Sequence, residues 1–234
     1  MRAFLHFKPV RGLVSVGLAL CLVASAVGLS SAQAEAPSQR EARVNASVDL
    51  ASLMAAFRAM PGLEATYEEE KHLALLAAPL RSKGTMFYAP GGYLLRRVEG
   101  AGGASMVLTP RELRVVEAGK TQRFDLRARP DIAHFVQSFL WILSGDEAAL
   151  NEHFEITFEA QTADTPWRLS LTPKDRNMAH IVRQIQVRGE GLFVQEVRVE
   201  EQSGDATVTR ITNANAERRF SDAERRALFE GSAQ

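Results

Sequence analysis

The sequence predicts an α+β, mainly β fold, in which one large curved antiparallel sheet of about eleven strands carries a helical insertion. Beyond Pro61, short extended runs alternate apolar with polar residues, and breaks rich in glycine and proline separate them. A strongly apolar helical stretch at 130–143 divides these runs into two groups. The alternation indicates that one face of the sheet is buried and the other is solvated.

An amphipathic helix is expected before the strands. Apolar residues recur at helical spacing over residues 48–60, and Pro61-Gly62 ends the pattern. Asp49 in its first turn and Arg58 in its last turn suit the helix dipole. Further helices are predicted at 130–143, 147–151 and 222–229.

The predicted strands lie on either side of the helical stretch at 130–143. The first group comprises 63–72, 80–88, 93–98, 104–108, 113–117 and 121–126. The second group comprises 153–159, 167–172, 181–188, 193–200 and 207–212. Side chains that we expect on the buried face, lining a ligand-binding cavity together with the apolar residues of the helix at 130–143, are Phe87, Leu95, Phe154, Ile156, Phe158, Trp167, Leu169 and Leu171.

The first 34 residues are typical of a cleavable secretory signal peptide. Three basic residues precede an apolar segment at 13–29, and Ala32-Gln33-Ala34 forms a small-residue site after which we predict cleavage. A permanent membrane anchor is the alternative, but a span needs about 20 uninterrupted apolar residues. The single cysteine, Cys21, lies within this segment, so the mature chain has neither a disulfide nor a thiol nucleophile. These features favour the periplasm of a bacterial envelope.

The mature chain fits one domain. Polar residues at 35–47 predict a flexible leader, and residues 48–234 supply enough chain for a single core. Without the signal, 25 basic residues face 28 acidic ones, which gives a net charge of −3. A nucleic-acid-binding protein usually carries an excess of basic residues, so this net charge argues against that class of function. We expect a monomer.

The helix at 130–143 is unusually apolar for an insertion between strands. Its apolar residues form one continuous stripe made of Ile132, Phe135, Val136, Phe139, Leu140 and Leu143. The helix is either a permanent plug of the core or a lid, with which an apolar ligand competes for the same concave surface. Six such side chains contribute roughly 10–15 kcal/mol gross, and an acyl chain of about sixteen carbons contributes a similar amount. The two are therefore close enough for reversible exchange.

Catalytic and metal-binding patterns are not found in the sequence. The four histidines of the mature chain are scattered, and no nucleophile elbow or phosphate-binding glycine loop occurs. Glu68-Glu69-Glu70 has the pattern of a solvated strand end. We therefore predict no enzyme activity, no catalytic residues, no metal and no cofactor.

Several stretches resemble the LolA-like family of periplasmic outer-membrane lipoprotein carriers, in its divergent branch. The resemblance runs from about Leu50 to Phe229, and its most specific stretches are Gly84–Pro90 and Leu171-Thr172-Pro173-Lys174. Ala65–Lys71, Ser144-Gly145-Asp146 and Trp167–Lys174 carry the rest.

The resemblance implies a half-barrel whose concave apolar face, closed by helices, holds the acyl chains of a lipoprotein or another lipid. It also implies an inner-membrane ABC-type or other exporter as donor and an outer-membrane acceptor. A lipid-sensing or lipoprotein-sensing regulatory domain on the same fold is the alternative. Members of the family place a lid-holding arginine where this chain has Ala89, and Arg96 and Arg97 are the candidates to replace it.

The apolar run at 73–80, between the first two predicted strands, allows two interpretations. It is either a long hairpin folded back onto the sheet or an exposed tip that touches a membrane or a partner.

Overall fold

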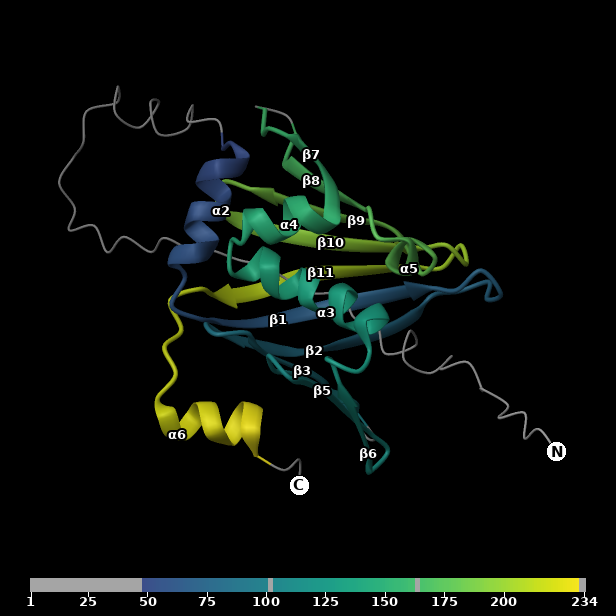
Figure 1. Cartoon of the computed structure of the whole chain (residues 1–234), viewed down its shortest axis with the longest axis vertical. Helices are drawn as coiled ribbons and strands as arrows, with labels where there is room; N and C mark the ends of the chain where they lie inside the picture. The colour runs from purple at the N-terminus through teal and green to yellow at the C-terminus, as the bar shows by residue number, and fades with distance from the viewer. Residues whose placement is uncertain (1–47, 101–102, 163–164, 232–234) are drawn as a thin grey trace.

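The structure is a computed structural model, and it describes residues 48–100, 103–162 and 165–231. The predicted signal peptide and leader lie outside these residues. A single sheet of eleven antiparallel strands forms the body of the protein, in the order β6-β5-β4-β3-β2-β1-β11-β10-β9-β8-β7 (Figure 1). The strands are β1 (Leu63–His72), β2 (Leu80–Ala89), β3 (Tyr93–Val98), β4 (Ser105–Leu108), β5 (Glu112–Glu117), β6 (Lys120–Asp125), β7 (Phe154–Glu159), β8 (Trp167–Pro173), β9 (Val182–Glu190), β10 (Phe193–Glu201) and β11 (Ala206–Asn215).

The helices cover the two faces of the sheet unequally. One face, which we call the concave face, is covered by α2 (Leu50–Ala59), α3 (Pro130–Leu143), α4 (Glu147–His153) and α5 (Arg176–Ala179). The opposite, convex face has a single cover at the C-terminus, formed by α6 (Asp222–Arg225) and the π-helical turn η1 (Arg226–Glu230). In Figure 1, α2, α3 and α4 lie in front of the sheet, and α6 lies apart from them at the lower left. None of the helices in the described ranges is long and apolar enough to cross a membrane.

The strand order divides the sheet into two wings that meet at a central seam. Consecutive strands pair with each other within β1–β6 and within β7–β11, and only the pairing of β1 with β11 joins strands of the two wings. β6 and β7 are consequently the two edges of the sheet. The connection between these edges passes through α3 and α4, which cross the concave face on the way.

The observed elements confirm the predicted fold class, and the differences have local causes. The first helix begins at Leu50 instead of residue 48 because Asp49 caps it, accepting a hydrogen bond of 2.7 Å from the Ser52 N–H in a capping box. The short helix α5 was not predicted, since its four residues are too few to show a period.

Two glycines permit close approaches that hold the core together. A Cβ on Gly189 would lie 2.4 Å from the Trp167 ring, so the missing side chain makes room for the largest fully buried residue. Gly145 follows α3 with a φ of +62°, and a Cβ there would lie 2.1 Å from the Met54 carbonyl oxygen of α2. The Arg58 guanidinium donates to the Gly145 carbonyl at 2.7 Å, which fixes α2 against the end of α3.

Candidate functional site

The concave face is one continuous apolar surface that receives side chains from both wings. From the first wing come Leu63, Tyr67, Met86, Tyr88, Leu94, Met106, Leu108, Leu113 and Val115. From the second wing come Phe154, Trp167, Leu169, Leu171, Val182, Ile185, Val187, Val194, Val197 and Val199. Each strand contributes alternate residues, as expected for a sheet with one buried face. Buried residues of four helices, α2, α3, α4 and α5, pack against this surface.

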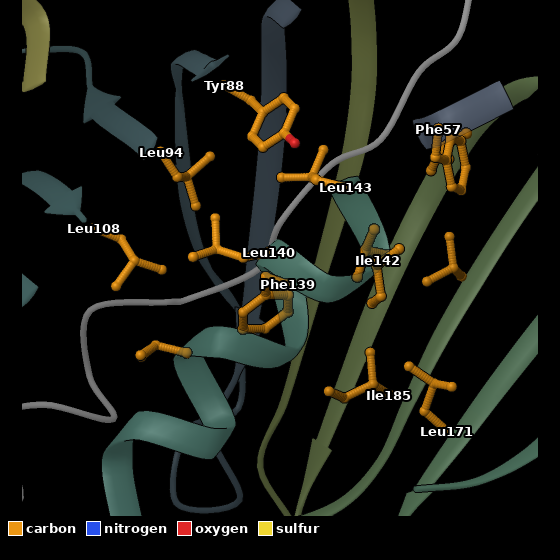
Figure 2. Close-up of a cluster of buried hydrophobic side chains, with 14 of the residues drawn as sticks. Phe57, Tyr88, Leu94, Leu108, Phe139, Leu140, Ile142, Leu143, Leu171 and Ile185 are labelled. Carbon is orange, nitrogen blue, oxygen red and sulfur yellow. The ribbon is translucent and has the colours of Figure 1, made fainter. Parts of the chain in front are cut away.

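Helix α3 fills the middle of this surface and contacts both wings. Figure 2 shows Leu140 pointing toward Leu94 and Leu108 of the first wing, whereas Ile142 points toward Leu171 and Ile185 of the second. Ile142 and Leu143 are 1% and 0% exposed. The stripe of six apolar residues predicted from the sequence is therefore only part of the buried surface of α3. Ile142 lies outside that stripe and is also buried, because α3 contacts both wings of the curved sheet.

The contacts of α3 with the sheet are apolar. Among the described side chains at 132–143, Ser138 donates to the Phe135 carbonyl within the helix, and no hydrogen bond or ion pair joins these side chains to a strand. On the outer side, the Trp141 ring stacks on His153 at 4.7 Å, and His134 lies 4.5 Å from the same imidazole. Burial of apolar area, which has no directional requirement, thus holds this part of α3 on the face.

One end of the concave face is polar although it is buried. Along β1 the inward-facing residues change from Tyr67 to Glu69 and Lys71, which are 6% and 7% exposed. Glu69 forms an ion pair with the Arg96 guanidinium at 2.6 Å and accepts a hydrogen bond from the Thr209 hydroxyl at 3.1 Å. Arg96 also lies over the Tyr67 ring, 4.4 Å from its centroid. We call the four charged residues Glu69, Lys71, Arg96 and Glu201 the polar end.

The second ion pair of the polar end joins β1 to β10. Lys71 Nζ lies 4.0 Å from Glu201 Oε1. Burial raises the pKa of Glu201, while the nearby Lys71 charge acts in the opposite direction. Buried pairs of this kind are rarely a net source of stability, because desolvation offsets their attraction. Both ion pairs lie buried at the edge of an apolar surface.

The structure places twelve of the fourteen predicted ligand-binding side chains on or against the concave cluster. Those that are buried are Ile132, Val136, Phe139, Leu140, Leu143, Phe154, Trp167, Leu169 and Leu171, and those that are partly buried are Phe135, Ile156 and Phe158. The other two, Phe87 and Leu95, lie on the convex face, in a separate cluster with Ala89, Val107 and Phe229.

The two arginines proposed for lid control point to opposite faces. Arg96 is 2% exposed and lies on the concave face at the polar end. Arg97 lies on the convex side, where its guanidinium is 5.9 Å from the Phe87 ring. Ala89 packs near Phe229, so a longer side chain at this position would point away from α3. Of the two candidates, only Arg96 is on the face that α3 covers.

The convex cluster is covered by a C-terminal helix with directional contacts. Ser221 and Glu224 form a capping box at its start. The buried Arg114 guanidinium donates to the Phe229 carbonyl at 3.1 Å, and Arg225 lies over the Tyr93 ring at 4.9 Å. This second helical cover is therefore fastened by hydrogen bonds and charges as well as by apolar contacts.

The apolar run between β1 and β2 is exposed. Leu75, Leu76 and Leu80 are 97%, 49% and 53% exposed, so of the two interpretations left open by the sequence the structure shows an exposed tip and not a hairpin folded back. A hollow of about 490 Å³ lies beside the same hairpin. Its walls carry acidic and basic side chains, namely Glu68, Glu69, Glu70, Arg81, Ser82, Lys83, Glu99 and Arg210, which do not suit an acyl chain.

Sequence reasoning missed the polar end and part of the apolar wall. Glu69 was predicted to be solvated, but it is buried because Arg96 and Thr209 reach it from neighbouring parts of the sheet. Tyr88 was assigned to a strand but not to the site. It is 3% exposed beside Leu143, and burial raises its pKa to about 12. In the described part of the chain, no three His, Cys, Asp or Glu residues gather as a metal site would require.

A curved, open antiparallel sheet with helices on its apolar concave face defines a half-barrel. A model of the family described as outer membrane lipoprotein carrier protein LolA-like matches residues 42–228. The chain belongs to this family. The chain matches no curated protein.

Solved structures with a similar arrangement differ widely in sequence. A LolA superfamily protein of Nitrosomonas europaea is 12% identical, with a TM-score of 0.42 over 74% of this chain and 94% of that one. A DUF1329 family protein of Desulfovibrio piger is 14% identical, with a TM-score of 0.47 over 77% and 96%. The MucA/MucB complex of Pseudomonas aeruginosa contains a chain 13% identical, with a TM-score of 0.41 over 75% and 60%. At these identities, the family assignment rests on the family model.

Proposed function

We propose that the protein is a periplasmic carrier that binds the acyl chains of a lipoprotein, or another lipid, on its concave face. The observation that carries the proposal is the way α3 covers that face. Its described side chains fill the middle of a wide apolar surface without a directional bond to any strand. A cover of this kind can be exchanged for an acyl chain of similar apolar area, because neither occupant requires a specific partner atom.

The polar end suits the other part of such a cargo. A lipid or lipoprotein carries a polar group where its acyl chains meet, and this group cannot enter an apolar surface without a hydrogen-bonding partner. Arg96, Glu69, Lys71 and Glu201 lie at the edge of the apolar surface and provide charges of both signs. In the proposed complex, the acyl chains replace α3 and the polar group lies at the polar end.

The proposal places the protein between two membranes. Family membership supports transfer of cargo from an inner-membrane ABC-type or other exporter to an outer-membrane acceptor. The secretory signal predicted at residues 1–34 agrees with this location. The role is binding and transfer without catalysis, and the working form is a monomer.

Cargo recovered with the protein tests the proposal. The protein released by expressing cells is purified without detergent, and its organic extract is analysed by mass spectrometry. We expect lipid or lipopeptide at about one molecule per protein. Phe154→Asp should lose this cargo, because it places a charge in the apolar wall of the sheet that the acyl chains would contact. A wild-type protein that carries no stoichiometric lipid and binds no fluorescent fatty acid after lipid removal contradicts the proposal.

The matched control is Phe229→Asp. Phe154 and Phe229 are 0% and 1% exposed, but they lie on opposite faces of the sheet. Both variants should be destabilised, and only Phe154→Asp should lose cargo. If Phe154→Asp does not fold, Ile156→Asp provides a milder change, because Ile156 is only partly buried on the edge strand β7.

A further inference from the structure

The loop between β1 and β2 forms an apolar tip, which we define as residues 73–80. Its sequence is Leu73-Ala74-Leu75-Leu76-Ala77-Ala78-Pro79-Leu80, without one polar or charged side chain. Leu75 is 97% exposed, more than any other large apolar residue in the described part of the chain. Single exposed leucines are common on protein surfaces, but an uninterrupted apolar segment at the end of a hairpin indicates an interaction site.

The apolar tip is held in position. The Ala74 N–H donates to the Asp205 carboxylate at 2.8 Å, which attaches the tip to the turn between β10 and β11. Within the tip, the Leu76 N–H donates to the Leu73 carbonyl at 2.9 Å. The two neighbouring turns extend beyond the sheet on the same side (Figure 1). The leucines are therefore presented to the outside by a supported loop.

The chemistry of the apolar tip fits a lipid bilayer better than a folded protein. A stable protein interface needs about 800 Å² from each partner, with hydrogen bonds that fix its orientation. One short loop cannot supply that area, and its side chains cannot supply those bonds. A bilayer requires only that a few apolar side chains enter its hydrocarbon region.

Charge attraction does not explain membrane binding at this site. The exposed cations beside the tip are already paired, Arg81 with Glu70 at 3.0 Å and Lys83 with Glu99 at 3.4 Å. Their carboxylate partners offset the attraction of these cations to anionic headgroups. Binding through the tip should therefore depend on apolar contact, with little sensitivity to salt or to lipid charge.

We propose that the apolar tip is a membrane-docking element that inserts Leu75 and Leu76 into the surface of a phospholipid bilayer. The tip and the polar end are adjacent. The tip follows His72, the last residue of β1, which lies opposite Ala206 of β11 in the sheet. The residue before His72, Lys71, forms the ion pair with Glu201 at the polar end. Docking would bring the polar end of the concave face to the membrane. That use of docking rests on the proposed carrier function, whereas docking itself does not.

Vesicle flotation tests the proposal. The protein released by expressing cells, with its N-terminus determined by mass spectrometry, is mixed with vesicles of phosphatidylcholine and with vesicles that also contain phosphatidylglycerol. Wild-type protein should float with both kinds of vesicle, at low and at high salt. Leu75→Asp combined with Leu76→Asp should reduce the vesicle-bound fraction at least tenfold, since two charges then face the bilayer.

The matched control is Phe193→Asp. Phe193 is another exposed large apolar residue, at 46%, but it lies at the opposite end of β10 from the turn that holds the tip. This variant should bind vesicles as wild type does. Wild-type protein that does not float, equal binding by the tip variant, or binding only to anionic vesicles that salt abolishes would overturn the proposal. A tip variant that loses vesicle binding but retains its cargo supports docking as a separate property, whatever the outcome of the cargo experiment.

Discussion

The two helical covers of the sheet are held in different ways. On the concave face, the described side chains of α3 make apolar contacts with both wings and no directional bond to a strand. On the convex face, the C-terminal helix has a capping box, a cation over an aromatic ring and a hydrogen bond from the buried Arg114 to its last turn. Both covers bury aromatic side chains completely. The two covers differ because, among the described residues, only those of the C-terminal helix are also held to the sheet by a hydrogen bond and by a cation over an aromatic ring.

This contrast separates a cover that can be exchanged from one that is permanent. Apolar burial is non-directional, so an acyl chain can replace the described side chains of α3 on the sheet without leaving a polar group of a strand unpaired. Displacing the C-terminal helix would leave Arg114 and the Phe229 carbonyl without each other, and an unpaired buried polar group carries a large cost. A lid function is therefore expected for α3 and a structural function for the C-terminal helix.

The largest expected effect comes from weakening the cover on the concave face. Leu143→Ala removes a fully buried side chain of α3 and should lower the free energy of unfolding of the lipid-free protein by about 2–5 kcal/mol. It should also tighten fatty-acid binding by about tenfold, or 1.4 kcal/mol, because the lid then costs less to displace. Urea unfolding and displacement of a fluorescent fatty acid measure the two quantities.

The matched change on the other face is Leu95→Ala. Leu95 is 1% exposed in the convex cluster, so the loss of stability should be similar. Its fatty-acid affinity should equal that of wild type. If both variants change affinity in the same way, α3 has no special role as a lid.

A smaller effect is expected from cutting the directional contact of the permanent cover. Arg114→Met removes the donor to the Phe229 carbonyl and should cost about 1–3 kcal/mol of stability, with cargo binding unchanged. Arg123→Met serves as the control, because Arg123 makes an exposed pair with Glu112 at 3.4 Å. Exposed pairs contribute about 0–1 kcal/mol. A change in cargo binding in Arg114→Met would show that the two faces are coupled.

The smallest effect concerns the cap of the C-terminal helix. Hydrogen bonds from the Ser221 backbone, from Arg218 and from the Ser221 hydroxyl lower the pKa of Glu224 to about 2. Because the folded-state pKa lies below the ordinary value of 4.5, the ionised carboxylate stabilises the folded protein above that pH. This stabilisation is lost as the pH falls from about 4.5 towards about 2.

Glu224→Gln should therefore unfold at lower urea concentration than wild type at neutral pH. The difference between the two proteins should shrink as the pH is lowered through that range. A constant difference at every pH would mean that the glutamate charge is not responsible. Fatty-acid binding should be the same in both proteins.

The sequence predicted the fold best where only one side of an element is buried. Alternation in β7 and β8 identified Phe154 and Trp167 as inward-facing, because their neighbours on the other face are solvated. In β2 and β3 the C-terminal helix buries part of the second face as well, so the alternation disappears. Phe87 and Leu95 were therefore assigned to the wrong face for a physical reason.

The polar end could not be predicted because its partners are distant in the chain. Glu69 lies within a charge run and resembles a solvated strand end, and nothing local indicates burial. Its partner Thr209 is 140 residues away. Local patterns report period and turns, whereas the pairing of buried charges depends on strand order, which only the folded sheet reveals.

The central seam also constrains how the molecule folds. Within each wing, consecutive strands pair with each other, so their contacts are close in sequence and form quickly. The β1–β11 pairing closes a much longer loop, so its contacts carry a larger entropic cost and should form late. Until β11 is available, neither wing can complete the concave surface. The last strands of the chain thus act as the closing step of assembly, and the apolar face remains exposed to off-pathway association until they pair.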